Sequence, residues 1–217
     1  DTGATGLTSK ALEKDLTLAF ARELADQLNA QPKIRAFLVR DKDEFISLSE
    51  RVMIARQHGA NLLVSLHADT LRQKDIRGAT VYTISDKASD SLAADLAIRE
   101  NLSDDVGGVE LKDEPVEVAD ILVDLTRRET QAFSIRLAES VVKSFDGQIG
   151  LINNPHRHAG FRVLQAPDVP SILLELGFLS NPEDEKLLTD AEWRKKVASR
   201  IVESVKAFQS PNLAKGG

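Results

Sequence analysis

Residues 61–67 read Asn-Leu-Leu-Val-Ser-Leu-His, a short apolar run that ends in a histidine. A similar run at 171–175, Ser-Ile-Leu-Leu-Glu, ends in a glutamate. Short, nearly continuous apolar runs are typical of strands that are buried on both faces, as in parallel sheets. Ligand sites in such sheets lie outside the carboxyl ends of the strands. We therefore expect both strands in an α/β core, with their polar final residues at one edge.

Helices and further strands are expected around this pair. Residues 12–28 carry a large apolar side chain at every fourth position, the stripe of an amphipathic helix. Ser47-Leu48-Ser49-Glu50 has the capping-box pattern and predicts a second helix that stops near Gly59. Further strands are expected at 34–39, 79–84 and 161–164. The predicted fold class is α/β, a mostly parallel twisted sheet flanked by helices on both faces.

One long segment interrupts this alternation. Residues 89–145 contain no strand pattern and read as helices joined by a polar link with Gly107-Gly108. We expect a helical insertion at 86–150, within one domain at 1–209. A last helix capped by Asp190 and a polar tail at 210–217 complete the chain.

Composition limits the classes of function. The 217 residues include 28 Lys and Arg against 34 Asp and Glu, so the net charge is −6, and there is no cysteine. Modest acidity without a basic run argues against nucleic acid or an anionic membrane as the main partner. No apolar stretch reaches the ~18 residues of a membrane span. No phosphate-binding glycine loop, Gly-x-Ser-x-Gly elbow or cysteine nucleophile is present.

Three acidic or imidazole side chains are predicted to share one edge of the sheet. His67 and Glu175 end strands, and Glu13 begins a helix that starts at the same edge. Imidazole and carboxylate suit zinc, and a further carboxylate suits a general base. The alternative is a hydrogen-bonded histidine, with Glu13 complementing a helix dipole. Glu175 is the stronger signal, because an isolated carboxylate in an apolar run is costly unless it has a partner.

Seven segments match one family in order along nearly the whole chain: Asp-Thr-Gly-Ala-Thr-Gly at 1–6, Glu-Lys-Asp-Leu at 13–16, Arg-Asp at 40–41, residues 51–60, Ser-Leu-His-Ala-Asp at 65–69, Val-Leu at 163–164, and Glu-Leu-Gly-Phe-Leu-Ser-Asn at 175–181. They resemble the zinc-dependent N-acetylmuramoyl-L-alanine amidases of bacterial cell-wall remodelling. The insertion makes the chain most similar to Gram-negative periplasmic cell-separation amidases. The resemblance implies that Glu13 and His67 are zinc ligands and that Glu175 is the catalytic glutamate.

The resemblance also implies a reaction and a setting. The substrate would be peptidoglycan, cut at the amide bond between N-acetylmuramic acid and L-alanine during septal splitting and daughter-cell separation. We expect a periplasmic monomer. The family has another histidine ligand, in an Asp-Pro-Gly-His-Gly-Gly segment that ends a first strand just before the position of Asp1. The alternative function is a non-catalytic peptidoglycan-binding or scaffold domain with an incomplete metal site.

The insertion is expected to inhibit the enzyme. In related amidases an insertion helix supplies an extra glutamate to the zinc, and a protein activator acting on that helix would release it. Glu110, after two glycines, is the first candidate, followed by Glu114 and Glu117. Ordinary exposed glutamates are an equal alternative. The apolar residues Ile121, Leu122 and Leu125 either contact the activator or face the core.

Three other polar residues have two interpretations each. Arg40, after the strand expected at 34–39, either orients a carboxylate or the site, or makes a structural ion pair. His156 and His158 suggest a second metal site, but Asn153-Asn154-Pro155 reads as a turn. We therefore expect these two histidines in a solvent-exposed loop.

Overall fold

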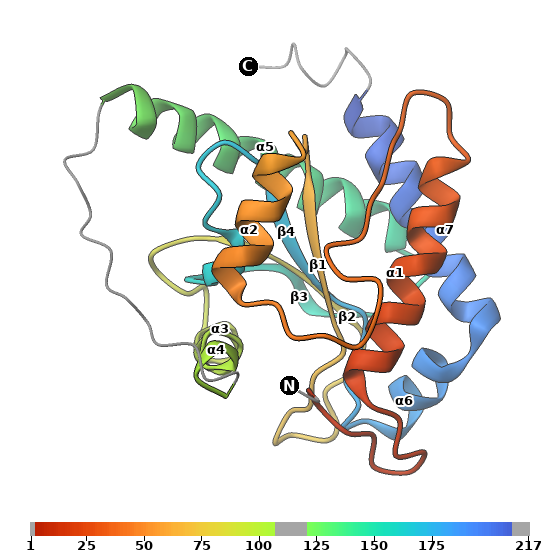
Figure 1. Ribbon diagram of the computed structural model, residues 1–217. Helices are drawn as coiled ribbons and strands as arrows, with labels where there is room; N and C mark the ends of the chain where they lie inside the picture. Colours follow the sequence, from red (N-terminus) through yellow and green to blue (C-terminus); the bar gives the residue numbers. More distant parts are fainter. Residues whose placement is uncertain (1–2, 107–120, 210–217) are drawn as a thin grey trace.

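The computed structural model describes residues 3–106 and 121–209 (Figure 1). Its four-stranded sheet has the order β1-β4-β2-β3, with strands β1 (Leu63–His67), β2 (Ala79–Ile84), β3 (Leu151–Ala159) and β4 (Ser171–Glu175). β1 runs parallel to β4 and β2 runs parallel to β3, whereas β2 and β4 are antiparallel. The predicted α/β class with a mostly parallel sheet is confirmed.

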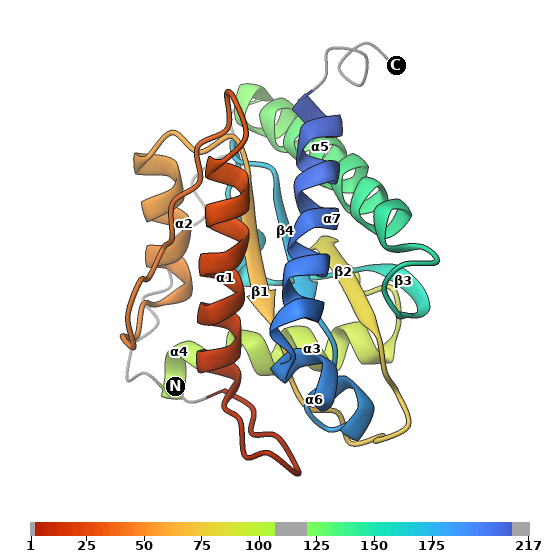
Figure 2. The same cartoon turned by 90° about the vertical axis from the view of Figure 1, so that its right-hand side faces the viewer.

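The helices cover both faces of the sheet. They are α1 (Glu13–Asn29), α2 (Leu48–Gln57), α3 (Ser91–Asn101), α4 (Ser103–Val106), α5 (Ile121–Phe145), α6 (Pro182–Thr189) and α7 (Ala191–Gln209). Figure 2 shows α1 and α7 side by side over one face, with α5 next to α7. No described helix is long and apolar enough to cross a membrane.

Alternating side chains of β4 join two separate cores. Leu174 packs in a cluster with Phe20 of α1 and Leu137 of α5. Its neighbour Leu173 points to the other face, into a cluster that includes Leu96 of α3. All five side chains are fully buried. Because each contributes about 1.5–3 kcal/mol of burial energy, β4 is fixed from both sides and its last residue cannot easily shift.

Two predicted helix starts are confirmed by their caps. Ser47 accepts a hydrogen bond from the backbone N–H of Glu50, whose carboxylate accepts one from the N–H of Ser47. At α7, Oδ1 of Asp190 accepts bonds from the N–H groups of Glu192 and Trp193. Such caps satisfy the unpaired amides of a first helical turn.

Two of the predicted strands are wrong. Residues 34–39 are extended but carry no strand ladder, and Phe37 is 42% exposed. A groove of about 650 Å³ separates this segment from β1, so it has no strand beside it to pair with. Residues 161–164 include a 3-10 turn at Arg162–Leu164 instead of a strand. Their apolar side chains are buried, which explains why the pattern resembled a strand.

The turn expected at 153–155 and the histidine loop after it are also wrong, because both lie in β3. Nε2 of His156 is 3.1 Å from Oγ1 of Thr83, and Nδ1 of His158 is 2.9 Å from the carbonyl oxygen of Lys87. Neither histidine belongs to a group of three or more possible metal ligands among the described residues. β3 is an edge strand, where polar residues and proline are tolerated, so its sequence does not look like a strand.

The segment at 86–150 is mostly helical where it is described. α3, α4 and α5 account for residues 91–101, 103–106 and 121–145. The three glutamates proposed as inhibitory, at positions 110, 114 and 117, lie outside the described residues, as does the polar tail at 210–217. The side chains of Ile121 and Leu122 are also outside the description, whereas Leu125 is 62% exposed.

Candidate active site

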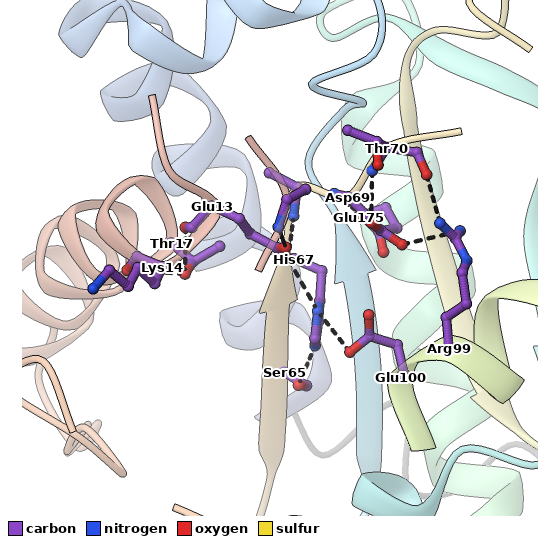
Figure 3. Close-up of polar contacts among 12 residues, drawn as sticks. Glu13, Lys14, Thr17, Ser65, His67, Asp69, Thr70, Arg99, Glu100 and Glu175 are labelled. Atoms are coloured by element: carbon purple, nitrogen blue, oxygen red, sulfur yellow. Dashed lines mark hydrogen bonds and ion pairs between the residues drawn. The ribbon is translucent and has the colours of Figure 1, made fainter. Parts of the chain in front are cut away.

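The two polar strand ends lie side by side. His67 ends β1 and Glu175 ends β4, and the two residues are direct partners in the parallel ladder. The N–H of Leu176 donates to the carbonyl oxygen of His67 at 2.9 Å, which continues the pairing beyond the strands. His67 and Glu175 therefore lie at the same edge of the sheet, as predicted, and Figure 3 shows both side chains.

Glu13 reaches the same place from the first residue of α1. Its side chain is buried, with Oε1 at 3.4 Å from Nδ1 of His67. Oε2 accepts a hydrogen bond from the N–H of Ala4 at 2.8 Å, and Oε1 accepts one from Ala68 at 3.1 Å. Gly3 has a φ of 63°, and a Cβ there would lie 2.5 Å from Oε2 of Glu13. Only glycine fits this approach without displacing the carboxylate.

Glu100 is a fourth member of the cluster that sequence reasoning missed. It lies near the end of α3, and its Oε2 is 3.2 Å from Nδ1 of His67 (Figure 3). In the sequence it stands among polar residues of a helix, Arg-Glu-Asn, and no spacing links it to the strands. The prediction of an inhibitory glutamate considered only positions after the two glycines.

The orientation of the imidazole is fixed from its other nitrogen. Nε2 of His67 lies 2.9 Å from Oγ of Ser65, so Nδ1 is directed at Glu13 and Glu100. Burial alone would lower the pKa of His67, but Glu100 and Glu13 outweigh it and raise the value to about 10. Burial would raise the pKa of Glu13, but His67 and two backbone amides lower it to about 2. Without a metal, the pair is an imidazolium and a carboxylate.

Glu175 is in a different environment. The residue is 0% exposed, and burial raises the pKa of its carboxyl well above the ordinary value. Oε2 accepts the N–H of Asp69 at 3.2 Å, and Oε1 has no hydrogen-bond partner among the described residues. A buried carboxylate with one free oxygen and a raised pKa is suited to accepting a proton.

Helix α3 is held against this edge by an ion pair next to Glu100. Nη2 of Arg99 is 3.0 Å from Oδ2 of Asp69, and Nη1 donates to the carbonyl oxygen of Thr70 at 2.7 Å. Burial raises the pKa of the Asp69 carboxyl, an effect that Arg99 opposes. Arg99 thus contacts the loop after β1, at Asp69 and Thr70, and Glu100 contacts His67 at the end of β1.

A polar cavity of about 390 Å³ opens in front of the cluster. Glu13, His67 and Glu100 line it, together with Arg40. Arg40 donates to the carbonyl oxygens of Lys14 at 2.7 Å and Lys42 at 3.1 Å. It makes no ion pair with a described residue, so the structural ion pair considered for Arg40 is absent from the described part of the chain.

The donor set fits zinc in kind and spacing. An imidazole nitrogen and carboxylate oxygens are zinc donors, and two ligand atoms at zinc bond lengths in a tetrahedron lie roughly 3.3 Å apart. The separations from Nδ1 of His67 to the oxygens of Glu13 and Glu100 are 3.4 and 3.2 Å. The described residues alone do not bring together three or more side chains that could hold a metal ion.

An α/β domain that gathers a histidine and several carboxylates beyond the ends of parallel strands has the side chains that metal-assisted hydrolysis uses. The model of the N-acetylmuramoyl-L-alanine amidase family matches residues 1–207. The chain belongs to this family, and the expected enzyme class, an amidase and therefore a hydrolase, is confirmed.

Individual relatives agree with this assignment. The chain is 37% identical over 209 residues to N-acetylmuramoyl-L-alanine amidase AmiA of Escherichia coli K12, covering 96% of this chain and 72% of AmiA. The chain is also 37% identical over 213 residues to AmiC of Escherichia coli O6:H1. That match covers 96% of this chain but only 50% of AmiC. The solved catalytic domain of the amidase CwlV from Paenibacillus polymyxa has the same fold, with a TM-score of 0.67, 24% identity and coverage of 96% and 90% of the two chains.

Proposed function

We propose that this domain is a zinc-dependent amidase that hydrolyses the bond between N-acetylmuramic acid and L-alanine in peptidoglycan. The observation that carries the proposal is the convergence of Glu13, His67 and Glu175 at one edge of the sheet. The family supplies the bond that is cut, and the donor set supplies the argument for zinc.

Zinc, when bound, polarises a carbonyl group and lowers the pKa of water towards neutrality. Glu13 and His67 would hold the metal, with the Glu13 carboxylate fixed by the amides of Ala4 and Ala68. Glu175 would accept a proton from water through its free Oε1 and return it to the leaving amine. Burial raises the pKa of Glu175, which makes its carboxylate a stronger proton acceptor.

A further ligand would come from a strand that precedes residue 1. The groove of about 650 Å³ between β1 and residues 34–39 has a largely apolar lining that includes Leu24, Val64 and Leu66. β1 is the last strand on this side of the described sheet, so its outer edge can accept a parallel strand. Such a strand would end beside His67, where the histidine of the upstream family motif is expected.

The insertion at 86–150 would be a regulatory part of the catalytic domain at 1–209. Oε2 of Glu100 lies 3.2 Å from Nδ1 of His67, the imidazole proposed to hold zinc, and Arg99 of the same helix pairs with Asp69. We therefore propose Glu100 as an inhibitory contact beside the expected Glu110, which lies outside the described residues. A protein activator would bind the insertion and move α3 away, and the exposed Leu125 remains a candidate for that contact.

We also propose a cellular role. Amidases of Escherichia coli are among them, which supports a periplasmic enzyme that acts in cell separation. We expect a monomer, because the activator and not a second copy would complete the active state.

The test uses Glu175→Gln in a protein that includes the upstream segment. This variant keeps the shape of the side chain but removes the base, so peptidoglycan hydrolysis should fall by roughly two to four orders of magnitude while zinc stays bound. Glu192→Gln, on the exposed surface of α7, is the matched control. Wild-type protein that binds no zinc and releases no peptide would instead favour the non-catalytic scaffold.

A further inference from the structure

Two arginines stand in the wall of the polar cavity without an ion pair to a described residue, although carboxylates such as Glu13 and Glu100 line the same cavity. Arg51 of α2 and Arg40 both line the cavity that His67 and Glu100 also line. Nε of Arg51 donates to the carbonyl oxygen of Ile46 at 2.9 Å. Neither guanidinium has a carboxylate within ion-pair distance among the described residues, and the Nη groups of Arg51 have no hydrogen-bond acceptor there.

Two like charges in a partly buried wall are unfavourable without compensation. Burial lowers the pKa of Arg51, and the positive charge of Arg40 lowers it further. The strongest opposing attraction comes from Glu100, the carboxylate on the helix that would have to leave during activation. When α3 moves away, the cavity keeps both guanidiniums and loses the strongest of the attractions on Arg51, while the weaker attraction of Glu13 on α1 remains.

We propose that Arg51, with Arg40 as its neighbour, forms a subsite for a carboxylate of the peptide half of the substrate. The inference rests on the proposed function, because it assigns a substrate group to one wall of the proposed active site. A guanidinium presents parallel N–H groups that match the two oxygens of a carboxylate. The carboxylate would belong to the residue after L-alanine, a few bonds from the amide that is cut.

The contacts of the arginines favour this over a structural role. The bond from Arg51 to Ile46 uses one of its five donors, and Arg40 bonds two neutral carbonyl groups. These bonds fix the directions of the side chains, and no described carboxylate forms an ion pair with either guanidinium. In the closed state the carboxylate of Glu100 attracts Arg51. In the open state the substrate carboxylate would take over this interaction.

The experiment compares two soluble muramoyl peptides in the Glu100→Ala background, so that α3 does not mask the subsite. One peptide has a free carboxylate on the residue after L-alanine, and in the other this carboxylate is amidated. Arg51→Gln should raise KM for the free acid by about ten- to a hundred-fold, the usual effect of losing a charge-assisted hydrogen bond. KM for the amidated peptide should change less than threefold. Arg56→Gln is the control, because Arg56 lies on the same helix but pairs with Asp168 at the surface.

Equal losses with both peptides would overturn the subsite, and so would no loss with either. If neither peptide is cut by the parent protein, the proposed function fails, which is a separate result. Arg51→Lys, which keeps the charge, guards against a folding defect and should retain part of the discrimination. Titration of the released free-acid peptide into the metal-free protein, followed by NMR, should show weaker binding in Arg51→Gln than in Arg56→Gln.

Discussion

Release of α3 by Glu100→Gln is the sharpest prediction. The substitution keeps the size of the side chain and removes the carboxylate that lies 3.2 Å from Nδ1 of His67. Burial and the nearby carboxylates of Glu13 and Asp69 raise the pKa of this carboxyl, and His67 opposes the rise. At that distance two unit charges attract by about 5 kcal/mol at an effective dielectric constant near 20. Desolvation of both partners reduces this, and a hydrogen bond between charged groups contributes roughly 1.5–3 kcal/mol net.

This energy sets the expected gain in activity. A loss of roughly 1.5–3 kcal/mol from the closed state multiplies the open fraction by about 10- to 150-fold while that fraction is small. A complete switch from 1:99 to 99:1 needs about 5.5 kcal/mol, so Glu100 alone does not supply it. The remainder is assigned to Arg99, with its bonds to Asp69 and Thr70 at 3.0 and 2.7 Å. Glu100→Gln should therefore be partly active, and a double variant with Arg99→Gln more active.

The assay is dye release from labelled peptidoglycan with no partner present. Asp95→Asn is the matched control, because Asp95 lies on the exposed side of the same helix. Hydrogen exchange of the α3 amides should rise in Glu100→Gln and stay unchanged in Asp95→Asn. If Glu100→Gln keeps its zinc and its fold but is no more active than Asp95→Asn, α3 does not inhibit through this contact.

Three further predictions concern the cluster itself. His67→Ala should lose zinc by metal analysis of the protein with its upstream segment, and undiminished zinc would contradict the ligand assignment. Gly3→Ala should weaken zinc binding and lower the melting temperature, because a Cβ would lie 2.5 Å from Oε2 of Glu13. Gly59→Ala is the control for the backbone effect, because Gly59 has a similar φ of 60° and a Cβ there would meet no atom within 4 Å. In metal-free protein the pKa of His67 is raised from 6.5 to about 10, so its stabilisation is complete below pH 6.5 and is lost as pH rises through 10. Urea unfolding should lose roughly 3–5 kcal/mol across that window, and a flat profile that matches His67→Gln would refute the pair.

The sequence predicted the parts of the site that lie on buried strands. His67 and Glu175 end runs of apolar residues, and an interrupted apolar pattern is visible in a single sequence. Their position at the same edge follows from the rules of parallel sheets, and the ladder between β1 and β4 agrees. The capping box at Ser47 predicted α2 for a similarly local reason.

The parts that were missed depend on contacts between distant segments. Glu100 reaches the site because α3 packs back over the sheet through Leu96, and no spacing in the sequence encodes that return. β3 was read as a turn and a loop because an edge strand can be polar and can contain Pro155. The segment at 34–39 has strand composition, but composition does not supply the neighbouring strand that a ladder requires.

The contacts of α3 also determine how sharply the enzyme would switch. Glu100 lies against Nδ1 of His67 and is at the same time the strongest attraction felt by Arg51. If one carboxylate covers a metal ligand and compensates the carboxylate subsite, its departure frees both together. Substrate and helix then compete for the same two positive regions, so a bound substrate carboxylate opposes the return of α3. An activator needs only to start the opening, because substrate binding itself stabilises the open state by its differential affinity for it.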